Sequence, residues 1–228
     1  MRIFTYTPPA GLPPVIYQDD DYLAINKPSG LLSNPGRAEN TYDCALTRLQ
    51  TAFGEIHLVH RLDCDTSGVM VFAKHKKAEG ALKKQLQERE IEKTYHALVW
   101  GVPKLAKGVI QFPLGPNPDD RPLQKIEPKG KAATTRYHLL EANTDSDTAL
   151  LELKPETGRT HQLRVHLEGI GHPILGDTFY GHAQAQAMQS RLCLHAKTLQ
   201  FSHPFSGQPV VIDTAVPFNL ASVATDIS

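Results

Sequence analysis

The chain has little cysteine, with three widely spaced residues in 228 and no CxxC pairing. Cys44, Cys64 and Cys193 therefore predict neither a disulfide framework nor a thiolate zinc site, and we expect three ordinary buried thiols. The sequence also lacks any apolar run that approaches a membrane span, and no charged leader followed by an apolar segment stands at its start. These absences predict a cytoplasmic protein.

An excess of positive charge is missing as well, because 24 Lys and Arg residues balance 24 Asp and Glu residues. Domains that bind nucleic acid often carry a basic excess. The charges are unevenly distributed, since residues 74–93 hold seven basic and four acidic residues and residues 121–136 hold five and one. Acids gather at 19–21 and 141–147. This pattern fits a basic face for an RNA backbone, and it fits equally well lysines that only solvate a helix surface.

The most informative segment is HRLDCDTSG, His60–Gly68, which concentrates two acids, a guanidinium, an imidazole and two hydroxyls. Carboxylate and hydroxyl oxygens can bond nearby amides, and Gly tolerates positive φ, so we expect a stiff loop. The run Val69–Ala73 that follows is short and rich in β-branched and aromatic residues, which predicts a core strand. A stiff loop on a rigid sheet is a suitable mount for a catalytic side chain.

Periodicity along the rest of the chain predicts more strands than helices. Apolar spacing predicts helices over Thr41–Phe53, with Thr41 as the N-cap, over Lys76–Arg89, and from about Thr160 onward. Strand patterns occupy Val15–Tyr17, Tyr22–Asn26, Thr94–Trp100, Ala133–Ala142, Thr148–Lys154, Leu192–Phe201 and Pro209–Ile212. No repeat or linker divides the chain. We therefore predict a single α+β domain over residues 1–228, with its core at about 12–218, built on a mixed or antiparallel sheet.

Four blocks cover most of the chain: AINKPSGLLSNPG (Ala24–Gly36), HRLDCDTSG (His60–Gly68), KTYHALVWG (Lys93–Gly101) and ETGRTHQLRVHLEGIGHPILGDTFYG (Glu156–Gly181). In this order they resemble the motifs of the RluA family of RNA pseudouridine synthases. The resemblance implies one catalytic domain with a large bent sheet, flanking helices and a central active-site cleft. Because the first block begins by Ala24, we also expect no additional RNA-binding domain before the core.

The resemblance places the family's catalytic residue on Asp63, its active-site tyrosine on Tyr95 and its arginine on Arg164. Conversion of uridine to pseudouridine breaks the N1 glycosidic bond and rejoins the uracil through C5, so it requires no metal and no cofactor. An ionised Asp63 would attack covalently or act as a base, and the sequence leaves both routes open. Arg164 would hold that carboxylate in place, and Tyr95 would stack on the uracil and accept the C5 proton.

A base in folded RNA must leave its stack before it can react, at a cost of roughly a few kcal/mol. By resemblance Arg61 would fill the vacated space, and His60 would contact the backbone or the displaced nucleotide. The closest likeness within the family is to dual-specificity members that act on a transfer RNA anticodon stem-loop and a large-subunit ribosomal RNA hairpin. The alternative is a single-specificity enzyme of the same family that acts on only one of these two RNAs. We expect a monomer whose partner is structured RNA, without membrane or metal.

Other classes of function fit single features of the sequence. DTSG, Asp65–Gly68, resembles an aspartic protease element, but that chemistry needs two carboxylates and no second D-[ST]-x-G copy occurs. His57, His60 and Asp63 have a spacing of three that a metal-dependent hydrolase could use, although no helix would align them. A catalytically silent RNA-binding module is a further alternative. On its own, Arg164 could merely pair with a glutamate one helical turn away, at 168.

Overall fold

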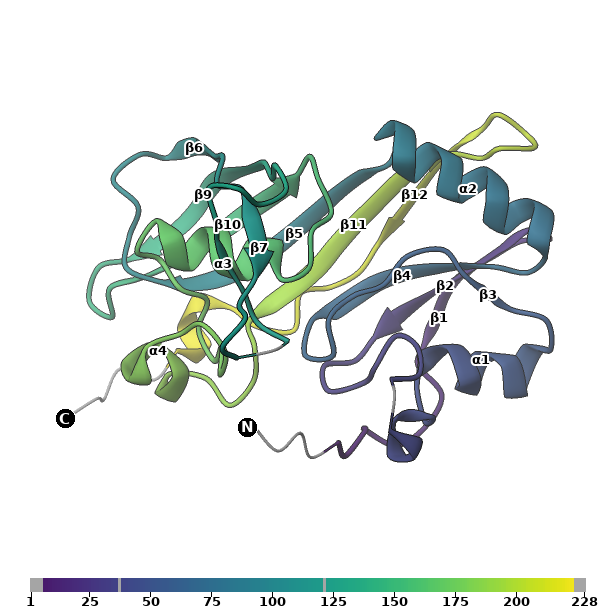
Figure 1. Cartoon of the computed structure of the whole chain (residues 1–228), viewed down its shortest axis with the longest axis horizontal. Coiled ribbons are helices and arrows are strands. Elements are labelled where there is room, and N and C mark those ends of the chain that lie inside the picture. The colour runs from purple at the N-terminus through teal and green to yellow at the C-terminus, as the bar shows by residue number, and fades with distance from the viewer. Residues whose placement is uncertain (1–5, 37, 121, 224–228) are drawn as a thin grey trace. The chain divides into compact units, whose positions relative to one another are not determined.

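The structure, a computed structural model, describes residues 6–36, 38–120 and 122–223 (Figure 1). The chain forms two compact units, and each is considered by itself. The HRLD unit comprises residues 6–93 and 196–215, and the Arg164 unit comprises residues 94–195 and 216–223. The single catalytic domain expected from the sequence stays a prediction.

The HRLD unit is a sheet with two helices. Its elements are β1 (Val15–Gln18), β2 (Tyr22–Lys27), a 3-10 helix (Glu39–Thr41), α1 (Ala45–Phe53), β3 (His57–Leu58), β4 (Ser67–Ala73), α2 (Lys76–Glu88), β11 (Leu194–Ser202) and β12 (Pro209–Asp213). Strand β2 pairs antiparallel with β1 and β4, β3 pairs with β4, and β12 pairs with β11. Strand β4, adjacent to β11, is therefore a central strand of this sheet.

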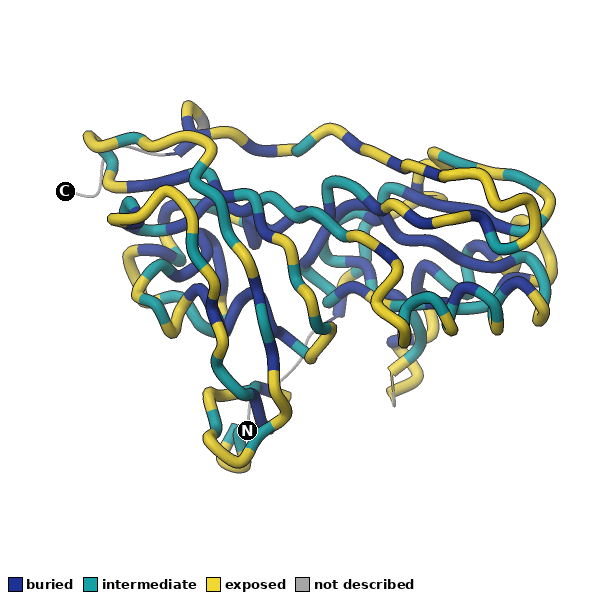
Figure 2. The backbone as a smooth tube through the Cα atoms, turned by 90° about the horizontal axis from the view of Figure 1, so that it is seen from above, coloured by how far each residue is buried: buried dark blue, intermediate teal, exposed yellow. Residues whose placement is uncertain are grey.

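Every residue of β4 is buried, which confirms the core strand predicted after the HRLD segment. Because side chains alternate between the faces of a strand, Val69 and Val71 pack with Ala78 and Leu82 of α2 on one face. Met70, like Phe72, points to the other face, and Figure 1 shows α1 on the side of these strands opposite α2. In Figure 2 the dark blue, buried stretches are concentrated in the strands.

Gly68 in β4 has no room for a side chain. Its φ is 114°, and a Cβ atom would lie 2.2 Å from the backbone oxygen of Ala196. We expect Gly68→Ala to lower the free energy of unfolding, measured in urea, by about 1–3 kcal/mol, because the new methyl group would overlap the backbone of β11 and the φ is disfavoured for alanine. Gly80→Ala is the matched control, because that position in α2 meets nothing within 4 Å and should gain up to about 1 kcal/mol. Equal effects at the two positions would contradict this view of β4.

The Arg164 unit has a second run of antiparallel strands in the order β5-β10-β9-β6. Its elements are β5 (Glu92–Trp100), β6 (Lys107–Ile110), β7 (Leu114–Pro116), β8 (Gln124–Ile126), β9 (Thr135–Asn143), β10 (Thr148–Pro155), α3 (Gln162–Gly169), α4 (Ala183–Ala187) and a 3-10 helix (Leu220–Ser222). The first two residues of β5 belong to the HRLD unit, and the first two residues of β11 belong to the Arg164 unit. Val99, Leu151 and Leu153 pack with Leu163 and Leu167 of α3 in one core.

The α+β class is confirmed, and most predicted elements are present with small shifts of their ends. The predicted start of the first helix at Thr41 is wrong. Thr41 lies in a 3-10 turn, and α1 is capped by Cys44, which exchanges hydrogen bonds with Thr47. The hairpin β7-β8 was missed because its strands have three residues each and β7 carries Gly and Pro. No helix within the described ranges is long and apolar enough to cross a bilayer.

Candidate active site

Lys27 is a buried cation that holds the HRLD loop, residues 59–66 between β3 and β4. Its Nζ donates to the carbonyl oxygens of Pro28 at 2.9 Å, Leu31 at 2.6 Å and Cys64 at 2.9 Å. Three acceptors match the three N–H donors of an ammonium group, which satisfies the buried charge. Lys27, which belongs to the first sequence block, Ala24–Gly36, therefore links that block to the HRLD loop at Cys64, the residue after Asp63.

Two serines of the same block complete this anchorage. Ser33 Oγ donates to Leu62 O at 2.7 Å and accepts from Leu62 N at 3.0 Å. Ser29 Oγ donates to Asp65 O at 2.7 Å. Backbone atoms on both sides of Asp63 are thus fixed by side chains about thirty residues earlier in the chain. The hydroxyl of Thr66, which the sequence predicted to brace the loop from within, has no hydrogen-bond partner among the described residues.

The side chains of the loop differ in exposure. Arg61 is exposed and Asp63 is half-buried, whereas Leu62 and Thr66 are buried. The amide of Thr66 donates to Asp63 O at 3.2 Å, which closes the turn. Arg61 is therefore the residue of this loop best placed to meet a large ligand.

His60 faces the protein through one ring nitrogen. Its Nε2 accepts from the amide of Val71 in β4 at 3.2 Å. Desolvation, followed by the positive charge of Lys93, lowers the pKa of His60 to about 3, so the imidazole is neutral at physiological pH. This bond fastens the loop to the sheet, and an RNA contact by His60 stays a prediction.

Arg164 is 2% exposed and forms a bidentate ion pair inside the Arg164 unit. Its Nε donates to Asp177 Oδ2 at 2.8 Å and its Nη2 to Asp177 Oδ1 at 2.6 Å. The guanidinium carbon lies 4.7 Å from the ring centre of Phe179 and 5.3 Å from that of Tyr180. The ion-pair partner is therefore Asp177, and the pairing with Glu168 considered from helix spacing does not form.

Asp177, which is fully buried, serves a turn as well as the ion pair. Its Oδ1 also accepts from the amides of Phe179 at 2.9 Å and Tyr180 at 3.2 Å. Tyr180 in turn bonds through its hydroxyl to Nδ1 of His161 at 2.6 Å. His161 has the left-handed φ of 53° and precedes α3. The last sequence block is thus one connected network around Arg164.

Tyr95 is half-buried in β5, where it pairs with Leu153 of β10. Tyr95 and Arg164 belong to the Arg164 unit, while Arg61, His60 and Asp63 share one loop of the HRLD unit. The proximity of Asp63 to Tyr95 and Arg164 is a prediction.

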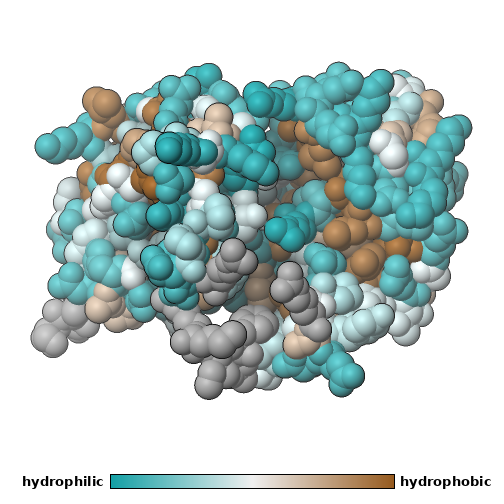
Figure 3. Space-filling view, in the orientation of Figure 1, coloured by the Kyte–Doolittle hydropathy of each residue, from teal (hydrophilic) through white to brown (hydrophobic). Residues whose placement is uncertain are grey.

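The basic residues of α2 are largely engaged with acids of their own helix. Glu79 accepts from Lys83 at 2.7 Å and Lys76 at 2.9 Å, and these two bonds, the Lys83 bond first, lower the pKa of Glu79 to about 2. The Nζ atom of Lys84 lies 3.9 Å from Oε1 of Glu88. Figure 3 shows hydrophilic residues over the outer face of this helix. A solvated surface fits α2 better than an RNA-binding face does. Of the second basic stretch, Arg121 lies outside the described residues.

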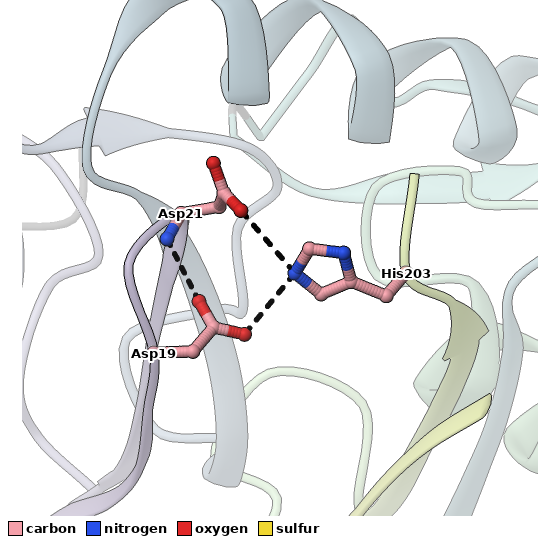
Figure 4. Close-up of side chains that lie close together, drawn as sticks. All are labelled: Asp19, Asp21 and His203. Carbon is pink, nitrogen blue, oxygen red and sulfur yellow. Dashed lines mark hydrogen bonds and ion pairs between the residues drawn. The ribbon is translucent and has the colours of Figure 1, made fainter. Parts of the chain in front are cut away.

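One group of three possible metal ligands converges within the described ranges, namely Asp19, Asp21 and His203 (Figure 4). His203 Nε2 lies 3.2 Å from Asp19 Oδ2 and 3.5 Å from Asp21 Oδ2. Its Nδ1 accepts from the amides of Phe205 and Ser206, so Nε2 carries the proton of the neutral ring. A metal would have to displace that proton. We therefore assign the group to fastening the β11-β12 hairpin to the β1-β2 turn.

The hydrolase ligands considered from the sequence do not converge. His57 Nε2 bonds Glu55 at 2.6 Å, and His60 Nε2 accepts from the backbone of β4. The three cysteines are thiols and form no disulfide, with Cys44 and Cys193 buried as expected and Cys64 half-buried, contrary to expectation. Desolvation raises the pKa of Cys193 to about 12, which suits a structural thiol.

Comparison with known proteins shows the family to which this fold and the sequence blocks belong. The family model for RNA pseudouridylate synthase matches residues 21–169, which include the HRLD loop, Tyr95 and Arg164. The chain belongs to the RNA pseudouridylate synthase family. The resemblance seen in the sequence is therefore confirmed, and the protease alternative is not favoured.

Relatives in this family cover nearly the whole chain. The dual-specificity RNA pseudouridine synthase RluA of Escherichia coli K12 is 48% identical over 90% of this chain and 93% of its own length. The RluA of Yersinia pestis is 50% identical, over 86% and 95%. The solved structure of human RNA pseudouridylate synthase domain containing 1 has a TM-score of 0.80 and 28% identity, and the match covers 96% of this chain and 90% of the human chain.

Two residues of the site escaped the sequence analysis. Neither Lys27 nor Asp177 was singled out as a functional residue. A signal existed for Asp177, because it is the one acid in an otherwise neutral stretch, GHPILGDTFYG, that follows the helix carrying Arg164. A buried arginine requires such a partner.

Proposed function

We propose that this enzyme isomerises specific uridines to pseudouridine in a transfer RNA anticodon stem-loop and in a large-subunit ribosomal RNA hairpin. The observation that carries the proposal is the HRLD loop, fixed by Lys27, Ser29 and Ser33 on both sides of Asp63. The family match supports the reaction. The dual specificity of the relatives, which cover most of this chain, supports the two targets.

The reaction is an isomerisation and its atoms balance within the nucleoside. The bond from C1′ to N1 breaks, a bond from C1′ to C5 forms, and the proton on C5 is lost while N1 gains one. Asp63 supplies the charged oxygen, either as nucleophile or as base. Arg164, aligned by Asp177, orients that oxygen, and Tyr95 stacks on the uracil and takes the C5 proton. No step needs a cofactor or a metal ion.

The experiment that tests this proposal is pseudouridine mapping on two transcripts, a transfer RNA and a ribosomal RNA hairpin, treated with the purified protein. Pseudouridine in both supports dual specificity, and pseudouridine in only one reduces the proposal to a single-target enzyme. If the protein forms no new pseudouridine in either transcript, and none in total cellular RNA treated in the same way, the proposal is refuted. We also propose that the protein acts as a cytoplasmic monomer, which light scattering and cell fractionation test.

Arg61→Ala should reduce turnover more on a stem-loop than on an unstructured strand, because Arg61 is exposed beside Asp63 and would replace the extruded base. We expect a loss of about tenfold or more on the stem-loop, since 1.4 kcal/mol of lost compensation corresponds to a factor of ten. Single-turnover rates on the two RNAs measure this. Arg61→Lys keeps the charge and tests whether the planar group is needed. Equal losses on both RNAs would rule out the filling role.

A further inference from the structure

The hydroxyl group of Thr66, at the end of the HRLD loop, is a buried polar group that the fold leaves without a bond. The residue is 2% exposed, and its Oγ1 has no hydrogen-bond partner anywhere in the described ranges. A hydroxyl group can donate one hydrogen bond and accept two, and burying it with none of these formed costs free energy. Among the residues that the structure describes, the folded chain therefore gains nothing from this oxygen.

Thr41, another buried threonine of the HRLD unit, shows the ordinary arrangement. It is 5% exposed, and its Oγ1 donates to Ala38 O and accepts from the amide of Gly36 at 2.9 Å. At position 66 a valine would fill the same space without an unsatisfied oxygen. An unsatisfied buried group in a folded protein calls for an explanation other than packing, and a catalytic role is a common one.

Thr66 closes the turn that begins at Asp63. Its amide donates to Asp63 O at 3.2 Å, which joins the first and fourth residues of the turn. The Cα atoms of such a pair lie within about 7 Å of each other. Both side chains are short, so rotation about χ1 can bring the hydroxyl and the carboxylate within hydrogen-bond distance. The backbone between them does not need to move, because side chains of the first sequence block already hold its carbonyl groups.

The Asp63 carboxylate is a better partner for this hydroxyl than the RNA itself. Oγ1 of Thr66 is buried, so a nucleotide could touch it only if the loop opened. The loop is anchored on both sides of Asp63, which opposes such an opening. Asp63 is half-buried, so its side chain has access both to the protein interior and to a bound nucleotide.

We propose that Thr66 is a positioning residue, whose hydroxyl donates to one carboxylate oxygen of Asp63 in the reacting complex and leaves the other oxygen for the reaction. This inference rests on the proposed function. A hydrogen bond from a hydroxyl to a carboxylate is charge-assisted and short. It fixes the orientation of the reacting oxygen and favours the ionised carboxylate. Because the bond forms only as the reaction takes place, it raises the rate without tightening RNA binding.

The test compares Thr66→Val with the wild type in single-turnover reactions over a range of stem-loop concentrations. The maximal rate should fall by roughly tenfold to a hundredfold, the range for one hydrogen bond to a charged group. The RNA concentration that gives the half-maximal rate should not change, as expected for a bond made only in the transition state. Thr66→Ser keeps the hydroxyl group and should recover most of the rate.

Thermal stability separates this role from a structural one. The melting temperature of Thr66→Val should equal or exceed that of the wild type, because the substitution removes an unsatisfied buried oxygen. Thr66→Ser loses a buried methyl group and should melt at a lower temperature. The valine variant is then the more stable and the slower of the two, whereas a structural role would make rate and stability fall together.

Thr41→Val is the matched control, because it removes a satisfied hydroxyl group away from Asp63. Its melting temperature should fall by about 2–4 °C, the shift for one lost hydrogen bond in a chain of this size, while its maximal rate stays unchanged. A melting temperature of Thr66→Val that falls in the same way would show that the Thr66 hydroxyl has a structural partner, and would overturn the inference.

The kinetic results can overturn the inference in three further ways. A wild-type maximal rate in Thr66→Val would do so, as would a loss that Thr66→Ser does not recover. A raised half-maximal RNA concentration with an unchanged maximal rate would place the hydroxyl on the RNA and not on Asp63. The wild type is assayed in parallel. If it modifies the RNA and Thr66→Val does so equally well, this inference alone fails. If the wild type modifies no RNA, the proposed function fails and this inference fails with it.

Discussion

Asp63→Asn should abolish pseudouridine formation while RNA affinity and unfolding free energy stay close to wild type. The side chains are nearly isosteric, and the anchors of the loop are backbone atoms of its neighbours Leu62, Cys64 and Asp65. Removing a general base costs about a hundredfold to ten-thousandfold in rate, whereas loss of a nucleophile costs about a million-fold in a serine protease. The single-turnover rate therefore also separates the two roles that the sequence left open.

Asp65→Asn is the matched control for this prediction. Asp65 lies in the same loop and is half-buried like Asp63, and its backbone oxygen, which accepts from Ser29, is unchanged by the substitution. It should keep most of the activity. Turnover by Asp63→Asn at the wild-type rate would remove Asp63 from the mechanism.

Asp177→Asn should lower both stability and turnover. The change removes the buried anion that holds the guanidinium of Arg164, which is 2% exposed, in a bidentate geometry. Breaking one side of a buried ion pair typically costs about 3–5 kcal/mol. Urea unfolding measures this loss, and kcat on the stem-loop should fall because Arg164 is no longer held in its bidentate geometry.

A double variant separates these two effects. Arg164→Met with Asp177→Asn removes both charges, and the Asn oxygen can still accept from the amides of Phe179 and Tyr180. Most of the stability should return, since replacing a buried pair by neutral groups is often close to neutral. Turnover should not return, because the guanidinium is absent. A stable double variant with wild-type kcat would show that Arg164 has only a structural role.

Several features of this protein followed from the sequence by itself. Strand β4 was predicted because a short β-branched run needs no distant information to be recognised as buried. Helix α2 was predicted from its apolar stripe. It ends at Glu88, and the next residue, Arg89, has the left-handed backbone conformation of a helix C-cap. The ordered blocks, rather than any one residue, determined the family, because each residue alone has an ordinary structural explanation.

Only the tertiary structure decided what holds the reactive side chains. Arg164 pairs with Asp177, thirteen residues away, and not with the glutamate one turn along α3. His60 accepts from the backbone of β4, and Lys27 gives its charge to three carbonyl groups. Local spacing reports which face of an element is apolar, but a buried charge takes its partner from whichever segment the fold brings within hydrogen-bond distance. For that reason the sequence identified the chemistry, and the packing of distant segments determined its supports.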